Sequence, residues 1–253
     1  MRLLVDYGNT RLKWALWSGG QRTLGGVFGH AEATFDAALA AAWGALPMPR
    51  SIHVASVVGD AREEALAELV VARFGRPAEF VRSPAHALGI VNAYREPERL
   101  GVDRFLGMAA LHAQAARAQV LVSCGTALTL DALDANGRHL GGLIAPSPAL
   151  MRRALGTATA RVGEDTGALV EMAGNTADAA WSGSILAAVA LIERFRGQVE
   201  RRLAGPAALV ADGGGVEEWL AQVSGIERGR DLVLRGLALW AARNDDGRAR
   251  PLG

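Results

Sequence analysis

The residues with the clearest chemical potential stand in one short stretch near the start of the chain, Val5-Asp-Tyr-Gly-Asn-Thr-Arg-Leu-Lys13. An apolar, strand-like run ends at Asp6, and a polar turn with a glycine follows. Carboxylate oxygens bind Mg²⁺, and glycine lets backbone N–H groups approach phosphate oxygens. The stretch predicts a phosphate site, with Asp6 near Mg²⁺ and Lys13 giving positive charge to the transferring group. Alone, it leaves an ordinary hairpin turn equally open.

The same pattern recurs in the second half of the chain. Leu3–Leu16 and Val120–Leu133 align at a constant offset without a gap, and Gly8 then falls on Gly125. Each copy reads as an apolar strand, a glycine turn with Asn or Thr, and a second strand. The duplicate favours nucleotide binding over a plain turn, because two glycine turns facing one cleft suit a polyphosphate.

Strand-like and helix-like segments alternate, which predicts an α/β class with two similar halves, residues 1–101 and 102–253. An irregular stretch with prolines, Pro84–Leu100, precedes the boundary. The predicted strands are Leu3–Tyr7, Leu12–Trp17, Ile52–Val57, Val120–Cys124, Leu128–Leu133, His139–Ile144 and Ala207–Ala211. The predicted helices are Ala33–Leu46, Ala61–Phe74, Asp103–Ala116, Thr176–Phe195 and Leu232–Arg243.

Two further segments carry residues suited to acid–base chemistry or to binding a nucleotide. Asp103 and Arg104 stand at the predicted start of an apolar helix, where Asp103 is either a helix-capping acid or a general base for a substrate hydroxyl. Arg104 suits an anionic substrate. The segment Leu209–Leu220 predicts a strand, three glycines and an amphipathic helix, an arrangement that can lie against a nucleotide. Thr176 reads first as a helix N-cap.

Composition excludes several other classes of protein. The 253 residues hold 27 Lys plus Arg and 26 Asp plus Glu, so the net charge of +1 argues against a nucleic-acid binder. The single cysteine, Cys124, fits a reducing, cytoplasmic setting and is expected to be a small buried residue. Asp6 interrupts the first apolar run, so no signal peptide is expected, and no run is long enough to span a membrane. The five histidines show no metal-ligand spacing.

Taken together, the motifs resemble type III pantothenate kinases, a family that includes the Bvg accessory factors. The resemblance follows the family order from Leu3 to about Ala242. It rests on "DYGNTRLK" from Asp6, "LGVDR" from Leu100, "LGGLIAP" from Leu140, "GNTADAAWSG" from Gly174 and "ADGGG" from Ala211. It implies two ribonuclease-H-like halves of the acetate and sugar kinase, Hsp70 and actin type, which agrees with the internal repeat.

The resemblance also implies an activity and the residues that perform it. The activity is ATP-dependent phosphorylation of pantothenate to 4'-phosphopantothenate, the first step toward coenzyme A, by a homodimer, with Asp103 as the general base. Mg²⁺ would be held through ATP near Asp6. The resemblance assigns ATP contacts to Asp6, Tyr7, Gly8, Asn9, Thr10, Arg11, Leu12, Lys13 and Thr126, and pantothenate contacts to Tyr94, Gly101, Val102, Asp103, Arg104 and Thr176.

One position departs from the family pattern. Many members carry an aspartate where this chain has Ser123, and the resemblance assigns that aspartate to a monovalent cation, K⁺ or NH₄⁺. A neutral hydroxyl is a weaker cation ligand than a carboxylate. The cation site is therefore either absent or built from backbone carbonyls. This loss leaves open a second hypothesis, a non-catalytic regulatory protein that keeps the nucleotide fold. Such a protein would be free to lose Asp6, Asp103 and Arg104, and the presence of all three argues against it.

Overall fold

The computed structural model describes residues 1–30, 35–159, 162 and 166–243, and the chain forms two compact units. The first unit contains Met1–Gln114 together with the chain from Leu232 onward, and the second contains Ala115–Asp231. These units differ from the predicted halves, because two helices beyond residue 101 belong to the first unit. The physical reason is close helix packing: at Gly236 a Cβ atom would lie 2.1 Å from the carbonyl oxygen of Leu106, so only glycine permits this contact.

The first unit is built on a five-stranded sheet in the order β3-β2-β1-β4-β5. Strand β1 pairs antiparallel with β2 and parallel with β4. The strands are β1 (Arg2–Tyr7), β2 (Arg11–Ser18), β3 (Gln21–Gly29), β4 (Ile52–Ser56) and β5 (Glu79–Val81). The helices of the unit are α1 (Phe35–Gly44), α2 (Asp60–Phe74), α3 (Val102–Gln114) and α6 (Leu232–Arg243). Between β5 and α3 lie the short β6 (His86–Ala87) and β7 (Ile90–Val91) and the 3₁₀ turn η1 (Pro97–Arg99).

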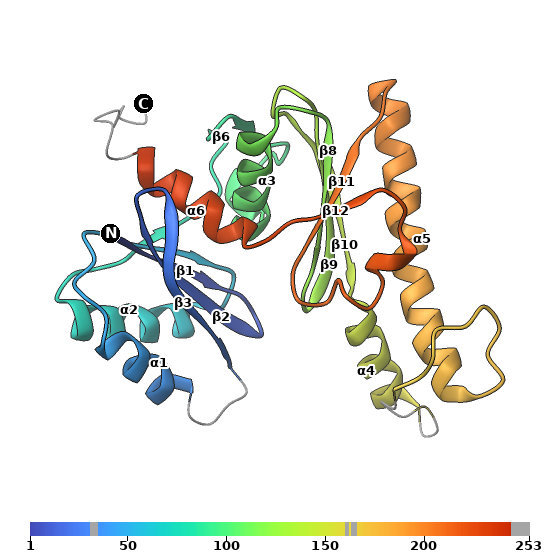
Figure 1. The fold of residues 1–253 in the computed structure, drawn as a ribbon, viewed down its shortest axis with the longest axis horizontal. Helices are drawn as coiled ribbons and strands as arrows, with labels where there is room; N and C mark the ends of the chain where they lie inside the picture. Colours follow the sequence, from blue (N-terminus) through green and yellow to red (C-terminus); the bar gives the residue numbers. More distant parts are fainter. Residues whose placement is uncertain (31–34, 160–161, 163–165, 244–253) are drawn as a thin grey trace. The chain divides into compact units, whose positions relative to one another are not determined.

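The helices of this unit cover both faces of its sheet (Figure 1). Helices α1 and α2 bury Trp43 and Phe74 against Leu3, Val5 and other alternate residues of the strands. Helix α6 packs on β1 and β4 from the other face and contacts α3. Because side chains alternate along a strand, the residues between the core positions, including Asp6, lie on the face toward α6.

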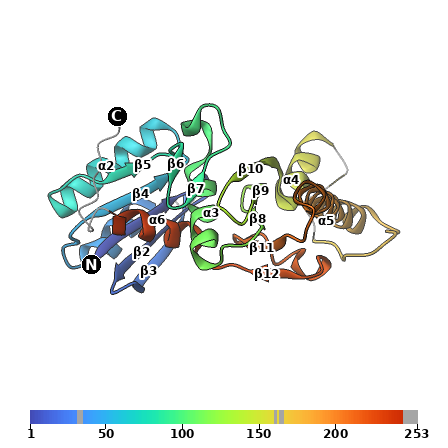
Figure 2. The same cartoon turned by 90° about the horizontal axis from the view of Figure 1, so that it is seen from above.

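The second unit repeats this design. Its sheet has the order β10-β9-β8-β11-β12, and β8 pairs antiparallel with β9 and parallel with β11. The strands are β8 (Gln119–Cys124), β9 (Ala127–Leu133), β10 (His139–Pro146), β11 (Ala208–Asp212) and β12 (Ile226–Arg228). Helices α4 (Pro148–Ala158) and α5 (Thr176–Leu203) complete the unit, with the 3₁₀ turn η2 (Leu220–Gln222). Figure 2 shows α5 nearly end-on beside α4, and the two helices contact each other.

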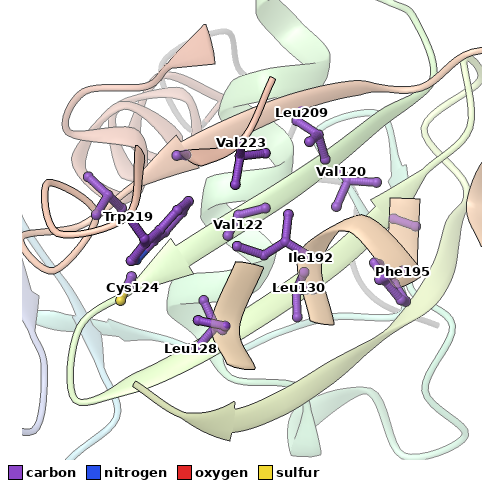
Figure 3. Packing of buried hydrophobic residues seen from close by; sticks show 14 of the residues in the cluster. Val120, Val122, Cys124, Leu128, Leu130, Ile192, Phe195, Leu209, Trp219 and Val223 are labelled. Atoms are coloured by element: carbon purple, nitrogen blue, oxygen red, sulfur yellow. The ribbon is translucent and has the colours of Figure 1, made fainter. Parts of the chain in front are cut away.

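The apolar core of the second unit lies between its sheet and α5 (Figure 3). Ile185, Ile192 and other α5 residues pack against alternate residues of β8 and β9, such as Val122 and Leu130. Both sheets thus share one strand order, with three antiparallel strands followed by two parallel ones, which is the predicted α/β class with a duplicated half.

The repeat is confirmed, but the predicted alignment without a gap is wrong by one residue. Tyr7 and Leu12 pair across the first turn and enclose four residues, whereas Cys124 and Leu128 pair across the second and enclose three. A shift of one position would turn every later side chain to the other face. With the shorter turn, the core positions correspond: Leu12, Trp14 and Leu16 match Leu128, Leu130 and Ala132.

The predicted strands and helices did not include β3, the short β5, β6, β7 and β12, the two 3₁₀ turns, or α4. Strand β3 contains Gly25 and Gly26, which weaken a strand signal, and the Trp14 ring lies across Gly26 on the neighbouring strand in place of a side chain there. Helix α4 begins with Ser147 as N-cap and Pro148 at its first turn, a start signal that was present in the sequence. The first two residues of the predicted helix Ala33–Leu46 lie outside the described residues. Among those that are described, no helix is both long and apolar enough to cross a bilayer.

A buried histidine gives the first unit a pH-dependent stability. Burial lowers the pKa of His53 below 6.5 and Arg243 lowers it further, while Glu79, 3.1 Å from the ring Nδ1, partly opposes this. Because the unfolded chain binds this proton at a higher pH than the folded chain, the neutral ring stabilises the fold above pH 6.5, and that stability is lost as the pH falls.

We therefore predict that His53→Gln reduces the loss of unfolding free energy between pH 7 and pH 5, as measured by urea titration at each pH. His86→Gln, at an exposed position, is the matched control and should follow the original chain. An unchanged pH profile for His53→Gln would contradict the prediction.

Candidate active site

The first phosphate hairpin joins β1 to β2 and presents its polar residues at the end of β1. The Gly8 N–H donates to the Arg11 carbonyl at 3.1 Å and closes the turn. Asn9 and Thr10 are exposed between them. Asp6 is half-buried and pairs in register with Lys13 on β2, so a carboxylate and an ammonium group share one face of the sheet. This is the donor and charge pattern that a phosphate with a bound Mg²⁺ requires.

Two residues of the predicted ATP loop have side chains in the core instead. Tyr7 is 5% exposed, and its ring lies parallel to Phe35 at 6.4 Å and edge-on to His30 at 5.0 Å. Leu12 is fully buried in the same cluster. Core packing occupies the side chains of both residues, so any role that they have in a phosphate loop falls to their main-chain groups.

A second group of predicted residues meets at the start of α3. The Phe105 N–H donates to the Gly101 carbonyl at 3.1 Å and begins the helix. The Asp103 carboxylate accepts the Arg104 N–H at 2.9 Å and folds over Gly101, where a Cβ atom would lie only 2.6 Å from its Oδ1. A carboxylate in the first turn is stabilised by the helix dipole, which favours its charged form. A side chain at position 101 would therefore require the Asp103 carboxylate to shift from this position.

Tyr94 reaches this group from the preceding loop. The Arg104 guanidinium donates to the Tyr94 hydroxyl at 3.1 Å, and its centre lies 5.8 Å from the middle of the Tyr94 ring. Asn92 fixes the loop, because its side chain accepts the Tyr94 N–H and donates to the carbonyls of Pro84 and Pro97. The structure therefore brings Tyr94, Gly101, Asp103 and Arg104 together, and their role as pantothenate contacts stays a prediction. Val102, also predicted, is buried.

The second hairpin carries Ser123 and Thr126 between β8 and β9. Ser123 is half-buried and pairs in register with Thr129 across the hairpin, the position that Lys13 holds opposite Asp6 in the first copy. The Ser147 hydroxyl donates to the Thr126 carbonyl at 3.0 Å and accepts the Leu150 N–H as the N-cap of α4. Ser147 thereby couples this turn to a helix, a role that the sequence analysis missed.

The segment after β11 lies directly against this hairpin. The Gly215 N–H donates to the Cys124 carbonyl at 3.0 Å, and at Gly213, with a φ of +103°, a Cβ atom would lie 2.2 Å from that same oxygen. The predicted amphipathic helix after the glycines is absent: only turns and the 3₁₀ turn η2 follow. We call residues 212–219 the glycine segment.

The helix fails to form because the side chains of the glycine segment are held in different directions. Trp219 is fully buried over the sheet beside Cys124 (Figure 3), whereas Glu218 forms an ion pair with Arg152 on α4. Cys124 itself is buried, which raises the pKa of its thiol and agrees with the predicted inert role.

Thr176 begins α5 but is not its cap. The N-cap is Asn175, whose side chain accepts the Asp178 N–H at 2.9 Å. The Asp178 carboxylate accepts the Ala168 N–H and the Asn175 side-chain N–H, each at 2.7 Å, and these two donors lower its pKa. The expectation of Thr176 as N-cap is therefore wrong by one position. Its side chain, which is exposed, is left available for another contact.

The comparison with known families gives one decisive match. Residues 2–198 match the type III pantothenate kinase family. The chain belongs to this family. The matched range contains the Asp6 hairpin, the start of α3, the second hairpin and the first part of α5.

Individual members of the family are similar over nearly their whole length. The type III pantothenate kinase of Laribacter hongkongensis is 42% identical, with 94% of this chain and 97% of the relative covered. That of Xanthomonas oryzae pv. oryzae strain PXO99A is 40% identical, with 94% and 96% covered. The chain therefore aligns with nearly the whole length of these relatives and not with one part of them.

Solved structures confirm the fold. A Baf family protein from Campylobacter jejuni has a TM-score of 0.63 at 17% identity, with 96% of this chain and 99% of that chain covered. MreB5 of Spiroplasma citri bound to ADP has a TM-score of 0.54 at 10% identity, with 99% and 98% covered. The two units are ribonuclease-H-like halves of the actin and sugar kinase type, as the family resemblance implied.

The close approach of Gly213 to Cys124 gives a stability prediction for this pantothenate kinase family member. Gly213→Ala adds a Cβ where the φ is +103° and the Cys124 carbonyl oxygen is 2.2 Å away. We expect it to lower the free energy of unfolding by about 1–3 kcal/mol, measured by urea titration. Gly183→Ala, on an exposed part of α5 with open space around it, should stabilise instead. Equal stability of the two variants would refute the proposed contact.

Proposed function

We propose that this chain transfers the γ-phosphoryl group of ATP to the hydroxyl of pantothenate, forming 4'-phosphopantothenate, the first step of coenzyme A biosynthesis. Its membership of the type III pantothenate kinase family supports the proposal, and so does the near-complete coverage of relatives with that name. The single observation that carries it is the cluster at the start of α3. There a carboxylate, a buried guanidinium and a tyrosine hydroxyl stand together within the matched range.

Asp103 is the proposed general base. A hydroxyl becomes a better nucleophile as its proton is accepted, and a carboxylate within hydrogen-bond reach can take that proton as the oxygen attacks phosphorus. The Arg104 N–H donates to Oδ1 and orients the carboxylate at the start of α3.

Pantothenate carries a carboxylate, and Arg104 is the proposed partner for its negative charge. The guanidinium is only 5% exposed and is oriented by the Tyr94 hydroxyl, so little side-chain freedom is lost when an anion binds. Tyr94, Gly101 and Val102 would line the same substrate site. Thr176 is proposed as an additional pantothenate contact.

The two hairpins are proposed to bind ATP. In the first, the backbone from Asp6 to Lys13 offers N–H groups to the phosphates, and the Lys13 ammonium offsets charge on the transferred group. Asn9, Thr10 and Arg11 are the exposed side chains of this turn. In the second hairpin, the exposed Thr126 is the proposed ATP contact.

Mg²⁺ fits the donor set at Asp6. Among the described residues, no three His, Cys, Asp or Glu side chains gather into a metal site. Mg²⁺ commonly takes one or two carboxylates, with phosphate oxygens and water completing its shell, so the single half-buried carboxylate of Asp6 is a suitable ligand. When bound with ATP, the ion supplies neutralisation of charge on the phosphate oxygens.

The alternative of a non-catalytic regulatory protein is not favoured. Asp6, Asp103 and Arg104 are all retained, and Arg104 donates from its main chain to Asp103 and from its guanidinium to Tyr94. We further propose that the enzyme acts in the cytoplasm as a homodimer, on the strength of the family resemblance and the single buried cysteine. Light scattering of the purified chain measures the oligomeric state, and a monomeric mass would refute the dimer.

The general-base assignment predicts the effect of one substitution. Asp103→Asn keeps the side-chain shape but removes the proton acceptor, so kcat for pantothenate phosphorylation should fall about 10²–10⁴-fold while ATP affinity stays unchanged. Glu98→Gln, an exposed acid in the preceding loop, is the control and should keep full activity. Full activity in Asp103→Asn would refute the role of this residue. No turnover by the original chain with Mg²⁺-ATP would refute the proposed function.

The monovalent cation of the family does not fit the residues around Ser123. The neighbouring position on the parallel strand β11 is Asp212, whose carboxylate accepts the Gly213 N–H at 2.8 Å and lies 3.8 Å from the Arg228 guanidinium. Ser123 thus offers only a neutral hydroxyl, and the nearby carboxylate already faces a positive charge. We propose that activity does not require K⁺ or NH₄⁺.

This proposal predicts equal rates in K⁺, NH₄⁺, Na⁺ and tetramethylammonium salts at one ionic strength. Ser123→Asp restores a carboxylate to this position and should make the rate respond severalfold to K⁺ or NH₄⁺. Thr129→Asp, which adds the same charge on the adjacent strand, controls for a general electrostatic effect. A strict need for K⁺ or NH₄⁺ in the original chain would contradict the proposal, and would favour a site built from backbone carbonyls.

A further inference from the structure

Arg228 at the end of β12 is not among the residues proposed above to contact ATP or pantothenate. Its Nη1 donates to the carbonyls of Ala211 at 3.2 Å and Gly229 at 3.4 Å, and its Nη2 donates to the carbonyl of Gly213 at 3.1 Å. Nη2 also lies 3.1 Å from Glu217. One guanidinium therefore contacts the backbone on both sides of Asp212 and the far end of the glycine segment.

These contacts fix the conformation of a segment in which no helix forms to fix it. Beyond Asp212 the glycine segment is neither strand nor helix, and its glycines lose more conformational freedom on ordering than other residues do. A planar guanidinium with five N–H donors can hold several carbonyl oxygens in fixed directions, which an ammonium group on a flexible stem does less well. Arg228 thus holds the segment from one side, while Arg152 holds Glu218 from α4.

The glycine segment contacts the second hairpin directly. The Gly215 N–H donates to the Cys124 carbonyl oxygen, and Gly213 packs so closely on this oxygen that a Cβ atom would not fit between them. Cys124 immediately precedes Gly125 and Thr126, the turn that we propose binds ATP. A movement of the segment must therefore move the carbonyl from which this turn begins.

We infer that Arg228 is a positioning residue for the nucleotide: by fixing the glycine segment against Cys124, it sets the affinity of the second unit for the nucleotide. The inference rests on the proposed function in one respect, that the ligand of this unit is a nucleotide. The residues proposed for pantothenate at the start of α3 belong to the other unit, and Thr176, also proposed for pantothenate, lies at the start of α5 and outside the glycine segment. Loss of Arg228 should therefore change the KM for ATP and leave the KM for pantothenate unchanged.

The test uses the full chain and Mg²⁺-ADP as the probe in titration calorimetry, because binding is measured without turnover. Arg228→Met keeps the length of the side chain and removes every donor, and we expect the Kd for ADP to rise about tenfold or more. Arg228→Lys keeps the charge and should recover part of the affinity. In steady-state kinetics, Arg228→Met should raise the KM for ATP by a similar factor with little change in kcat.

Arg117→Met provides a matched control, because the ion-pair partner of Arg117 lies on the same strand as Arg228. Arg117 forms an exposed ion pair with Glu227, the residue before Arg228, and neither residue contacts the glycine segment through that pair. This variant should bind ADP like the original chain. Melting temperatures of all variants without nucleotide identify any loss of folding, and Arg228→Lys carries the test if Arg228→Met does not fold.

Three outcomes would overturn the inference. They are an unchanged Kd for ADP in Arg228→Met (in Arg228→Lys if Arg228→Met does not fold), an equal rise in Arg117→Met, and no ADP binding by the original chain. If the original chain binds ADP but does not phosphorylate pantothenate, the proposed function fails, while the calorimetry with Arg228 variants still decides the role of this residue.

Discussion

The parallel pairing of β1 with β4, and of β8 with β11, places the functional groups of each unit. Parallel strands end at the same edge of a sheet, so residues that are distant in sequence come to adjacent positions there. Ser123 and Asp212 are direct partners in this pairing although 88 residues separate them in the sequence. The antiparallel partner strand then returns from the same edge and brings a third side chain beside them. Hydrophobic packing of the helices stabilises the sheets, and the polar side chains proposed to act on the substrates lie at the ends of their strands.

The two hairpins show how one framework can carry different charge. In the first, Asp6 stands opposite Lys13, and in the second the same two places hold Ser123 and Thr129. In the second unit the charged side chains lie around the glycine segment instead. There Arg228 contacts Glu217 and backbone carbonyls, and Arg152 forms an ion pair with Glu218. A neutral hairpin supported by charged neighbours can accept a polyphosphate without an added positive ion at Ser123, which is the basis of the proposed indifference to K⁺ and NH₄⁺.

Local sequence was sufficient for much of this fold because its signals are short-range. The strands of both hairpins alternate or run continuously apolar, and the turn residues lie next to them. The cluster of Asp103, Arg104 and Gly101 is also local, since three neighbouring residues form it. Tyr94 was assigned through the family resemblance, because its contact with Arg104 spans ten residues of irregular loop.

The missed features depend on contacts that no local pattern contains. Strand β3 is weak by itself and is completed by the Trp14 ring across Gly26. The helix expected after Gly215 had the right periodicity, but distant arginines and the burial of Trp219 hold the chain in turns. Arg228 was invisible as a functional candidate because its partners are backbone carbonyls, which every residue has.

The difference of one residue between the two turns has a meaning for the history of the chain. Two units with one strand order are what duplication of an ancestral segment produces, and the copies then accumulate insertions and deletions. Within either strand, the loss of one residue would exchange core and outer side chains over everything beyond it, and such a copy would not fold. In the turn, the same loss leaves Leu12 and Leu128 in equivalent core positions. The turns are thus the places where the two copies could change length independently, and the site chemistry diverged beside them.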